Sequence, residues 1–129
     1  MLLKPFNIPE AHHLIGGTWT PGANTIPVIN PSTGQNLTTI ARGTANDIDA
    51  SVTAANAALN NDWGSMTALE RGRILTKIGQ LVLEHTETLA ELEAMDVGKP
   101  LTQARADAIA LARYMEFYGG AADKIHGET

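Results

Sequence analysis

Few residues in this chain could carry covalent catalysis. The sequence contains no cysteine, which excludes disulfides, thiolate metal sites and a cysteine nucleophile. Its serines, histidines and acidic residues do not fall into the pattern of a hydrolytic triad. The glycine-rich segment YGGAADKIHG (118–127) has neither the spacing nor the strand–helix setting of a dinucleotide-binding fingerprint. These residues alone therefore indicate no complete active site.

The four histidines are His12, His13, His85 and His126. Adjacent side chains such as His12 and His13 seldom face the same ion, and no two histidines stand four residues apart as in a helical zinc site. We interpret the pair as surface residues. His85 is predicted to lie at a helix end, where partial positive charge is favourable.

The segment EAMDVGKPLTQARAD (93–107) joins two stretches with helical patterns. Gly98 can adopt the left-handed conformation that closes a helix, and Pro100 cannot continue one but suits the start of the next. Lys99 is favourable at the negative end of a helix, whereas a carboxylate at Asp96 is unfavourable there. The segment is therefore predicted to be a helix stop that carries one misplaced negative charge.

Composition limits the classes of function. The chain has 129 residues, a net charge of -5, a pI near 5.2 and 43% hydrophobic residues, as expected of about one globular domain. Its basic residues are few and dispersed, so nucleic acid is not an expected partner. No run of about 20 apolar residues predicts a membrane span, and the first 13 residues hold no signal-peptide core. We therefore expect no membrane association and a cytoplasmic location.

The first part of the chain, residues 1–43, is rich in Gly, Pro, Thr and Asn. Short β-branched runs alternate there with turn signals such as TPGAN and NPSTGQN. We predict three short strands, at about residues 14–20, 27–30 and 37–42.

The second part, residues 44–129, has helical patterns. Thr44 and Thr67 are predicted N-caps, each followed three residues later by an acidic residue. A third helix is expected from about Thr86 to near Gly98, and a fourth over about 102–118, which Gly119 and Gly120 weaken or end. The apolar stripes predicted for the first two helices are Ile48, Val52, Ala55 and Leu59, and Ile74, Ile78, Leu81 and Val82. The fold class is α+β, with short strands followed by about four helices.

The order of several motifs adds a resemblance to a known family. The chain carries VINPSTG (28–34), WGSMTALERGRIL (63–75), LEAMDVGKPL (92–101) and YGGAADKIHGET (118–129) in that order. Over about residues 12–129 it resembles the N-terminal region of the NAD(P)-dependent aldehyde dehydrogenase superfamily. Within that superfamily, the betaine-aldehyde and aminoaldehyde dehydrogenases look most similar.

The resemblance implies a larger α/β enzyme that uses NAD or NADP. In such enzymes the cofactor-binding Rossmann-like fold, the nucleophilic cysteine and the general-base glutamate all follow the point that matches Thr129. Residues 44–129 would then be the helical part of an incomplete cofactor-binding domain, and the catalytic domain would be absent. Because this reaction requires a thiolate, the resemblance implies that the present chain is inactive by itself.

The resemblance also implies two sites. A monovalent cation, K⁺ or Na⁺, would be held by backbone carbonyls at Val28 and Ile29 and by Asp96, where it would relieve the misplaced negative charge. The alternative is that Asp96 is solvated or paired with Lys99. In relatives that act on cationic aldehydes, an acidic residue matching Asp107 lines the mouth of the substrate channel.

For Asp107 the alternative is an exposed helix charge beside Arg105. An aromatic cluster at Tyr114, Phe117 and Tyr118, together with Met115, could face the channel, but packing against an absent domain is the simpler interpretation.

Two hypotheses about partners remain open at this stage. In the first, the chain is part of a dehydrogenase whose remainder supplies cofactor and nucleophile. In the second, it is a stand-alone interaction module that docks on a homologous subunit. A chance likeness of an unrelated helical binding protein is the third and weakest. Apolar stripes without partners also predict self-association.

Overall fold

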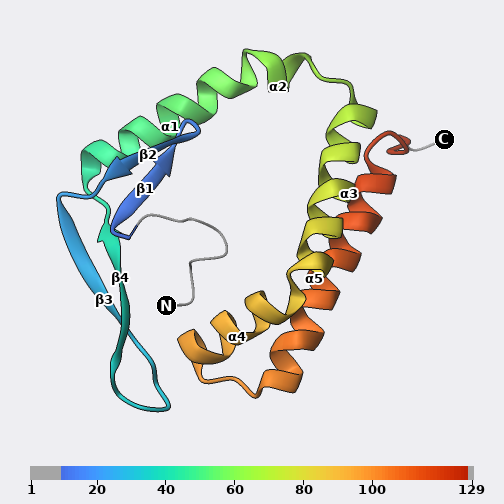
Figure 1. Cartoon of the computed structure of the whole chain (residues 1–129). Helices are drawn as coiled ribbons and strands as arrows, with labels where there is room; N and C mark the ends of the chain where they lie inside the picture. The colour runs from blue at the N-terminus through green and yellow to red at the C-terminus, as the bar shows by residue number, and fades with distance from the viewer. Residues whose placement is uncertain (1–9, 128–129) are drawn as a thin grey trace. The chain divides into compact units, whose positions relative to one another are not determined.

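The computed structural model describes residues 10–127, in which strands come first and helices follow (Figure 1). The elements are β1 (His12–Ile15), β2 (Thr18–Pro21), β3 (Asn24–Ile29), β4 (Asn36–Arg42), α1 (Ala45–Leu59), α2 (Asp62–Ser65), α3 (Ala68–Glu84), α4 (Thr86–Val97) and α5 (Leu101–Ala121). The chain forms two compact units. One holds the strands, α1, most of α2 and residues 95–98, and the other holds α3, the rest of α4, and α5. The α+β class predicted from the sequence is confirmed.

The first hairpin pairs β1 with β2 in antiparallel register, with Ile15 opposite Thr18. Gly16 and Gly17 connect the strands with φ of 58° and 79°, the left-handed values of a two-residue turn that glycine adopts readily. The prediction of one strand over 14–20 was therefore wrong. A Gly-Gly pair between two short β-branched runs is itself a hairpin signal.

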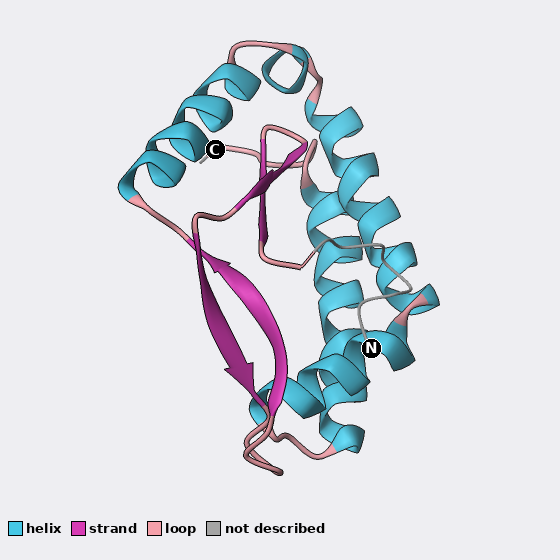
Figure 2. Cartoon of the chain, turned by 60° about the vertical axis from the view of Figure 1, so that its left-hand side comes forward, coloured by secondary structure: helices cyan, strands magenta, loops and turns pink. Residues whose placement is uncertain are grey.

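The second hairpin is longer and pairs β3 with β4, as the magenta strands of Figure 2 show. Its strands confirm the predicted ones at 27–30 and 37–42 but begin earlier, at Asn24 and Asn36. The register shifts between Val28 and Ile29, which marks a bulge or irregularity in β3. In the connecting turn, the side-chain oxygen of Asn30 accepts a hydrogen bond from the backbone N–H of Ser32.

Both predicted helix caps are present. Thr44 and Asp47 form a capping box at the start of α1, and Thr67 and Glu70 form another at the start of α3. In each box the hydroxyl accepts a backbone N–H of the first turn and the carboxylate accepts the N–H of the cap residue. At the far end of α4, Gly98 has φ of 73°, as predicted for the helix stop.

The last helix, α5, differs from its prediction. It runs through Gly119 and Gly120 and ends at Ala121. A Cβ on Gly119 would lie 2.6 Å from Oγ1 of Thr76 and 2.7 Å from the carbonyl oxygen of Gly72. Gly119 is therefore a close-packing residue within α5, because only a hydrogen fits between the two helices at this point.

Helices α3 and α5 are antiparallel neighbours within their unit (Figure 1). Gly72 contacts Gly119. About two turns further along α3, Gly79 contacts Ala112, whose carbonyl oxygen would lie 2.9 Å from a Cβ on Gly79. Small residues thus form the contact on both helices. This contact lies on a different side of α3 from most of its predicted apolar stripe.

The buried apolar residues are small. They are Ala90, Ala104, Ala108 and Ala112, and no large side chain within residues 10–127 is fully buried. The predicted stripes are largely exposed: Ile48 is 61% exposed, Leu59 63% and Ile78 40%. The predicted apolar faces of α1 and α3 are therefore left mostly exposed by the rest of the described residues.

None of the helices described for residues 10–127 is long and apolar enough to cross a membrane.

Candidate functional site

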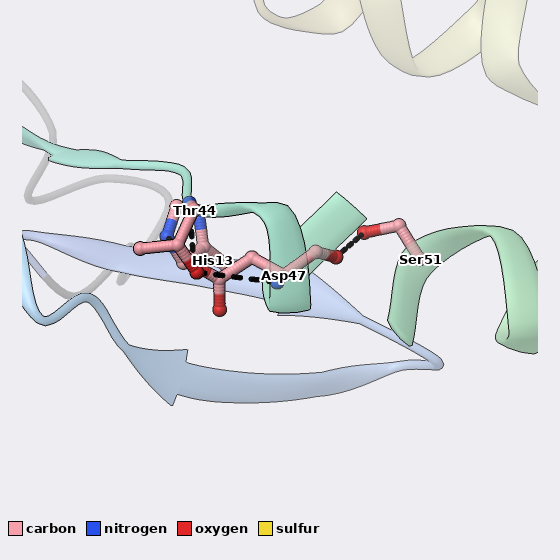
Figure 3. Close-up of polar contacts among 4 residues, drawn as sticks. All are labelled: His13, Thr44, Asp47 and Ser51. Carbon is pink, nitrogen blue, oxygen red and sulfur yellow. Dashed lines mark hydrogen bonds and ion pairs between the residues drawn. The ribbon is translucent and has the colours of Figure 1, made fainter. Parts of the chain in front are cut away.

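The start of α1 lies against β1 through His13 and Asp47. Figure 3 shows the imidazole beside the capping box, and Nε2 of His13 is 3.8 Å from Oδ2 of Asp47. The same carboxylate oxygen accepts hydrogen bonds from the backbone N–H of Thr44 at 2.8 Å and from its hydroxyl at 2.7 Å. These bonds from Thr44 lower the pKa of the Asp47 carboxyl, and His13 adds a smaller effect.

The prediction that His13 lies at the surface was wrong. Its side chain is only 18% exposed, and within the described residues its Nε2 is buried without a hydrogen-bond partner. The neighbouring ring of His12 hydrogen-bonds the backbone oxygen of Glu10 instead, with 2.6 Å between Nδ1 and that oxygen. The two imidazoles therefore have separate partners, because successive strand residues point to opposite faces.

A second polar cluster lies where α4 is followed by α5. The ammonium of Lys99 donates to Oε1 of Glu93 at 2.6 Å and also to Oδ2 of Asp107. Oδ1 of Asp107 accepts a hydrogen bond of 3.2 Å from the side-chain amide of Gln103. Lys99 therefore links the end of one helix to the first turns of the next.

Hydrogen bonds stabilise the charged forms of Lys99 and Asp107. The bond from Lys99 lowers the pKa of the Asp107 carboxyl, and Gln103 lowers it further. In return, Asp107 and Glu93 raise the pKa of Lys99. The charged forms of Lys99 and Asp107 are thus favoured at neutral pH, and both side chains are partly exposed.

A further ion pair joins the same two helices. Both Nε and NH2 of Arg105 approach the carboxylate of Glu87 at 2.9 Å, the two-point geometry that suits a guanidinium. Arg105 is therefore occupied by Glu87 and does not neutralise Asp107. The sequence alone did not indicate Glu87 and Glu93, because only the folded turn brings α4 carboxylates to residues of α5.

The residues predicted to hold a cation all belong to the first compact unit. Val28 and Ile29 lie at the register shift of β3, where the strand ladder is interrupted. Asp96 lies in the last turn of α4, and residues 95–98 group with the strands. A Cβ on Gly98 would lie 3.0 Å from Cγ of Pro31, just beyond β3. The helix end and the strand end are therefore neighbours.

The donor set at this place fits a weakly charged, oxygen-seeking ion. An interrupted ladder and a helix C-terminus both leave backbone carbonyls without strand or helix partners. The Asp96 carboxylate is exposed, and the described part of the chain gives it no hydrogen bond or ion pair, since Lys99 is engaged elsewhere. No group of three or more His, Cys, Asp or Glu side chains within residues 10–127 could hold a metal ion by side chains alone.

The outer side of α5 carries the aromatic cluster noted in the sequence. Tyr114, Phe117 and Tyr118 are 62%, 68% and 59% exposed. The rings of Phe117 and Tyr118 meet edge to face at 5.2 Å. Within the described residues the cluster is not covered.

Comparison with protein families gives one match over most of the chain. Residues 19–129 match the model of the aldehyde dehydrogenase family. An aldehyde dehydrogenase from Aspergillus niger is 40% identical over 117 residues, which are 89% of this chain and 24% of that protein.

Solved structures give the same result. A crystal structure from Burkholderia cenocepacia, assigned to the aldehyde dehydrogenases, is 57% identical and superposes with a TM-score of 0.87 over 91% of this chain and 25% of that chain. A point mutant of the betaine aldehyde dehydrogenase from Staphylococcus aureus, solved with NAD⁺, is 32% identical and superposes with a TM-score of 0.89. The match covers 98% of this chain and 26% of that chain. The chain thus spans about a quarter of the length of these relatives.

Proposed function

The chain belongs to the aldehyde dehydrogenase family, and from this we propose that it serves as the N-terminal part of an enzyme that oxidises aldehydes to carboxylic acids with NAD or NADP. The observation that carries the proposal is the agreement in both sequence and fold with one end of these dehydrogenases. The Staphylococcus aureus relative with bound NAD⁺ supports the choice of cofactor.

In this proposal the chain contributes structure and not the reacting groups. Oxidation of an aldehyde through a covalent thioester needs a thiolate and a bound nicotinamide cofactor. The sequence contains no cysteine and no dinucleotide fingerprint. We therefore assign the nucleophile and the cofactor site to the remainder of a dehydrogenase or to a homologous subunit.

The exposed apolar faces support this assignment. Ile48 and Leu59 on α1 and Ile78 on α3 lie on faces that an independent domain would bury. A larger enzyme offers the surfaces that could cover them. In this proposal the small α3–α5 contact, built from glycine and alanine, is completed by packing from outside the chain.

The cation site is the second part of the proposal. Carbonyl groups at Val28 and Ile29, with the Asp96 carboxylate, would hold K⁺ or Na⁺. Such an ion would supply positive charge at the end of α4, where the helix carbonyls and Asp96 concentrate negative charge. Its role would be to fix the helix end against the strand end, and it would take no part in the oxidation.

For the substrate we propose an aldehyde, with a cationic one such as betaine aldehyde or an aminoaldehyde as the more specific alternative. The acidic residue for that alternative is Asp107, which would lie at the mouth of the substrate channel. Because Lys99 already neutralises much of the Asp107 charge, an ammonium substrate would have to share the carboxylate with it. Asp107 would then tune selectivity modestly.

A chimera tests the main proposal. Residues 12–129 would replace the matching segment of the Burkholderia cenocepacia relative, and NADH formation from an aldehyde would be measured at 340 nm. We expect the chimera to retain activity and the isolated chain to show none. A folded chimera without activity would contradict the proposal, and NADH formation by the purified chain alone would contradict the assignment of the nucleophile to the remainder.

The same chimera separates the proposal from an interaction module. A module that docks on a homologous subunit should bind the intact relative without replacing its N-terminal segment. Tight binding of the isolated chain to the intact relative, combined with an inactive chimera, would favour the module.

A further inference from the structure

A buried imidazole nitrogen lies beside the first turn of α1. Nε2 of His13, on β1, is buried and has no hydrogen-bond partner within residues 10–127. Burying a polar atom in this way costs free energy, because the atom loses its hydration and gains nothing in return. Oδ2 of Asp47 is 3.8 Å away, which is too long for a hydrogen bond. A neutral His13 therefore leaves one polar atom unsatisfied between the first hairpin and α1.

Protonation of His13 would change this contact. An imidazolium carries an N–H on both ring nitrogens, so Nε2 would then present positive charge to the Asp47 carboxylate. The two side chains are only 18% and 24% exposed, and water screens a partly buried pair less than a surface pair. The hydrogen bonds from Thr44 mainly lower the pKa of Asp47, and the attraction of His13 adds to this effect. The two groups are therefore electrostatically coupled.

The other charged groups around β1 do not replace Asp47 as a partner of His13. β2, β4 and α1 all pack against β1. β2 has no titratable side chain, β4 has Arg42, which is exposed, and α1 has the exposed Asp49 besides Asp47. On β1 itself, His12 has a separate backbone partner. Asp47 is therefore the charge that a protonated His13 would meet.

The first turn of α1 makes the contact depend on the charge of Asp47. The start of a helix is partly positive, so by itself it disfavours a nearby cation. The Asp47 carboxylate offsets this effect. Because its lowered pKa keeps Asp47 ionised from about pH 5 to 8, His13 is the member of the pair whose charge changes in that range.

We propose that His13 and Asp47 form a pH-sensitive contact, which holds the β1–β2 hairpin against the start of α1 more tightly when the imidazole is protonated (Figure 3). A histidine whose charged form gains a partner on folding stabilises the fold fully below its unfolded-state pKa, ordinarily about 6.5. This stabilisation is lost as the pH rises through the folded-state pKa. The contact goes beyond the proposed dehydrogenase role and does not depend on it.

Thermal melts of the chain at about pH 5.5 and about pH 8, on either side of the ordinary histidine titration, test the proposal. His13→Gln removes the titrating group and keeps a polar side chain. It should lower the melting temperature by about 1–4 °C more at the acidic pH than at the basic pH. In an Asp47→Asn background, His13→Gln should lose this pH dependence or reverse it, because the positive end of α1 then lacks the carboxylate.

Two further variants are matched controls. His12→Gln removes the neighbouring imidazole, and its effect should be the same whether position 47 is Asp or Asn. Glu70→Gln changes the corresponding carboxylate in the capping box of α3. Its effect should be equal at the two pH values, because Thr67 and Arg73, which act on Glu70, do not titrate between them.

Three results would overturn the proposal: equal effects of His13→Gln at both pH values, a larger effect at the basic pH, or a pH dependence that persists with Asp47→Asn. If His13→Gln prevents a cooperative melt, Asp47→Asn alone decides. It should lower the melting temperature more at the acidic pH than at the basic pH, because only there does it remove an ion pair. An equal loss at both would mean that Asp47 acts through the capping box alone.

Discussion

At the scale of single residues, the adjacent Gly119 and Gly120 show how neighbours of the same type can have different roles. Both lie inside α5. Gly119 touches α3, where an added Cβ would lie 2.6 Å from Thr76 Oγ1, whereas Gly120 has no atom within 4 Å of that position. The sequence shows two identical residues, and only the packing of the two helices distinguishes them.

Alanine at these two positions should therefore have opposite effects. Gly119→Ala must push α3 and α5 apart and should lower the free energy of unfolding by about 1–3 kcal/mol, the usual cost of overpacking. Gly120→Ala gains helix propensity without a clash and should raise that free energy by up to about 1 kcal/mol. Urea denaturation followed by circular dichroism measures both. Equal effects of the two substitutions would mean that Gly119 does not mediate a close helix contact.

The Lys99 cluster gives a second test at this scale. Lys99→Met should lower the melting temperature, because Glu93 and Asp107 then lose their shared cation. Lys124→Met removes an equally charged residue whose ammonium, within residues 10–127, pairs with its sequence neighbour Asp123, and it should change the melting temperature less. Differential scanning fluorimetry compares the two. A larger effect at Lys124 would show that the cluster does not connect α4 with α5.

At the scale of elements, signals contained within a few residues predicted the structure well. The capping boxes at Thr44 and Thr67 and the stop at Gly98 involve residues at most four apart, so each is complete in the sequence. The hairpin turn at Gly16 and Gly17 was equally local but was not recognised. Two other features depend on contacts that form only on folding. One is the continuation of α5 through Gly119, which packs against α3, and the other is the ion pair of Lys99 with Asp107.

The capping box of α3 should make stability depend on pH. Hydrogen bonds from Thr67 to the Glu70 carboxylate hold the pKa of Glu70 below its ordinary value of 4.5. A carboxyl whose pKa is lowered in the folded state stabilises the fold fully above its unfolded-state pKa. This stabilisation is lost as the pH falls through the folded-state pKa. Glu70→Gln can still cap the helix but cannot titrate. Its melting temperature should be below that of the parent chain at pH 7, and the difference should shrink below about pH 4.5.

Glu84, the last residue of α3, is the control for this prediction. Because a negative charge at a helix C-terminus is unfavourable, Glu84→Gln should leave the melting temperature at pH 7 equal or slightly higher. Thermal melts by circular dichroism between pH 3 and 7 measure both variants. A Glu70→Gln difference that stays constant across this range would show that ionisation of Glu70 contributes nothing.

At the scale of the whole molecule, the main feature is the shortage of large buried side chains within residues 10–127. Alanine forms the buried set, while many larger apolar residues are exposed. The sequence predicted the helices and their apolar faces, but it could not show which faces this chain buries by itself. Two sites were predicted. The three residues of the cation site, Val28, Ile29 and Asp96, belong to one compact unit, and the channel residue Asp107 pairs with Lys99.

The proposed cation at Val28, Ile29 and Asp96 would join elements far apart in the sequence, so its effect belongs at this scale. An ion that binds only the folded chain stabilises it by mass action. K⁺ at about ten times its dissociation constant would add roughly 1.4 kcal/mol.

We expect a higher melting temperature in KCl than in choline chloride at equal ionic strength. Asp96→Ala should remove most of this difference, because the carbonyls alone would retain the ion poorly. Asp49→Ala, which removes an exposed carboxylate from α1, should keep it. If the melting temperatures in the two salts are equal, or if Asp96→Ala still responds to K⁺, the segment from Asp96 to Pro100 is only a helix stop.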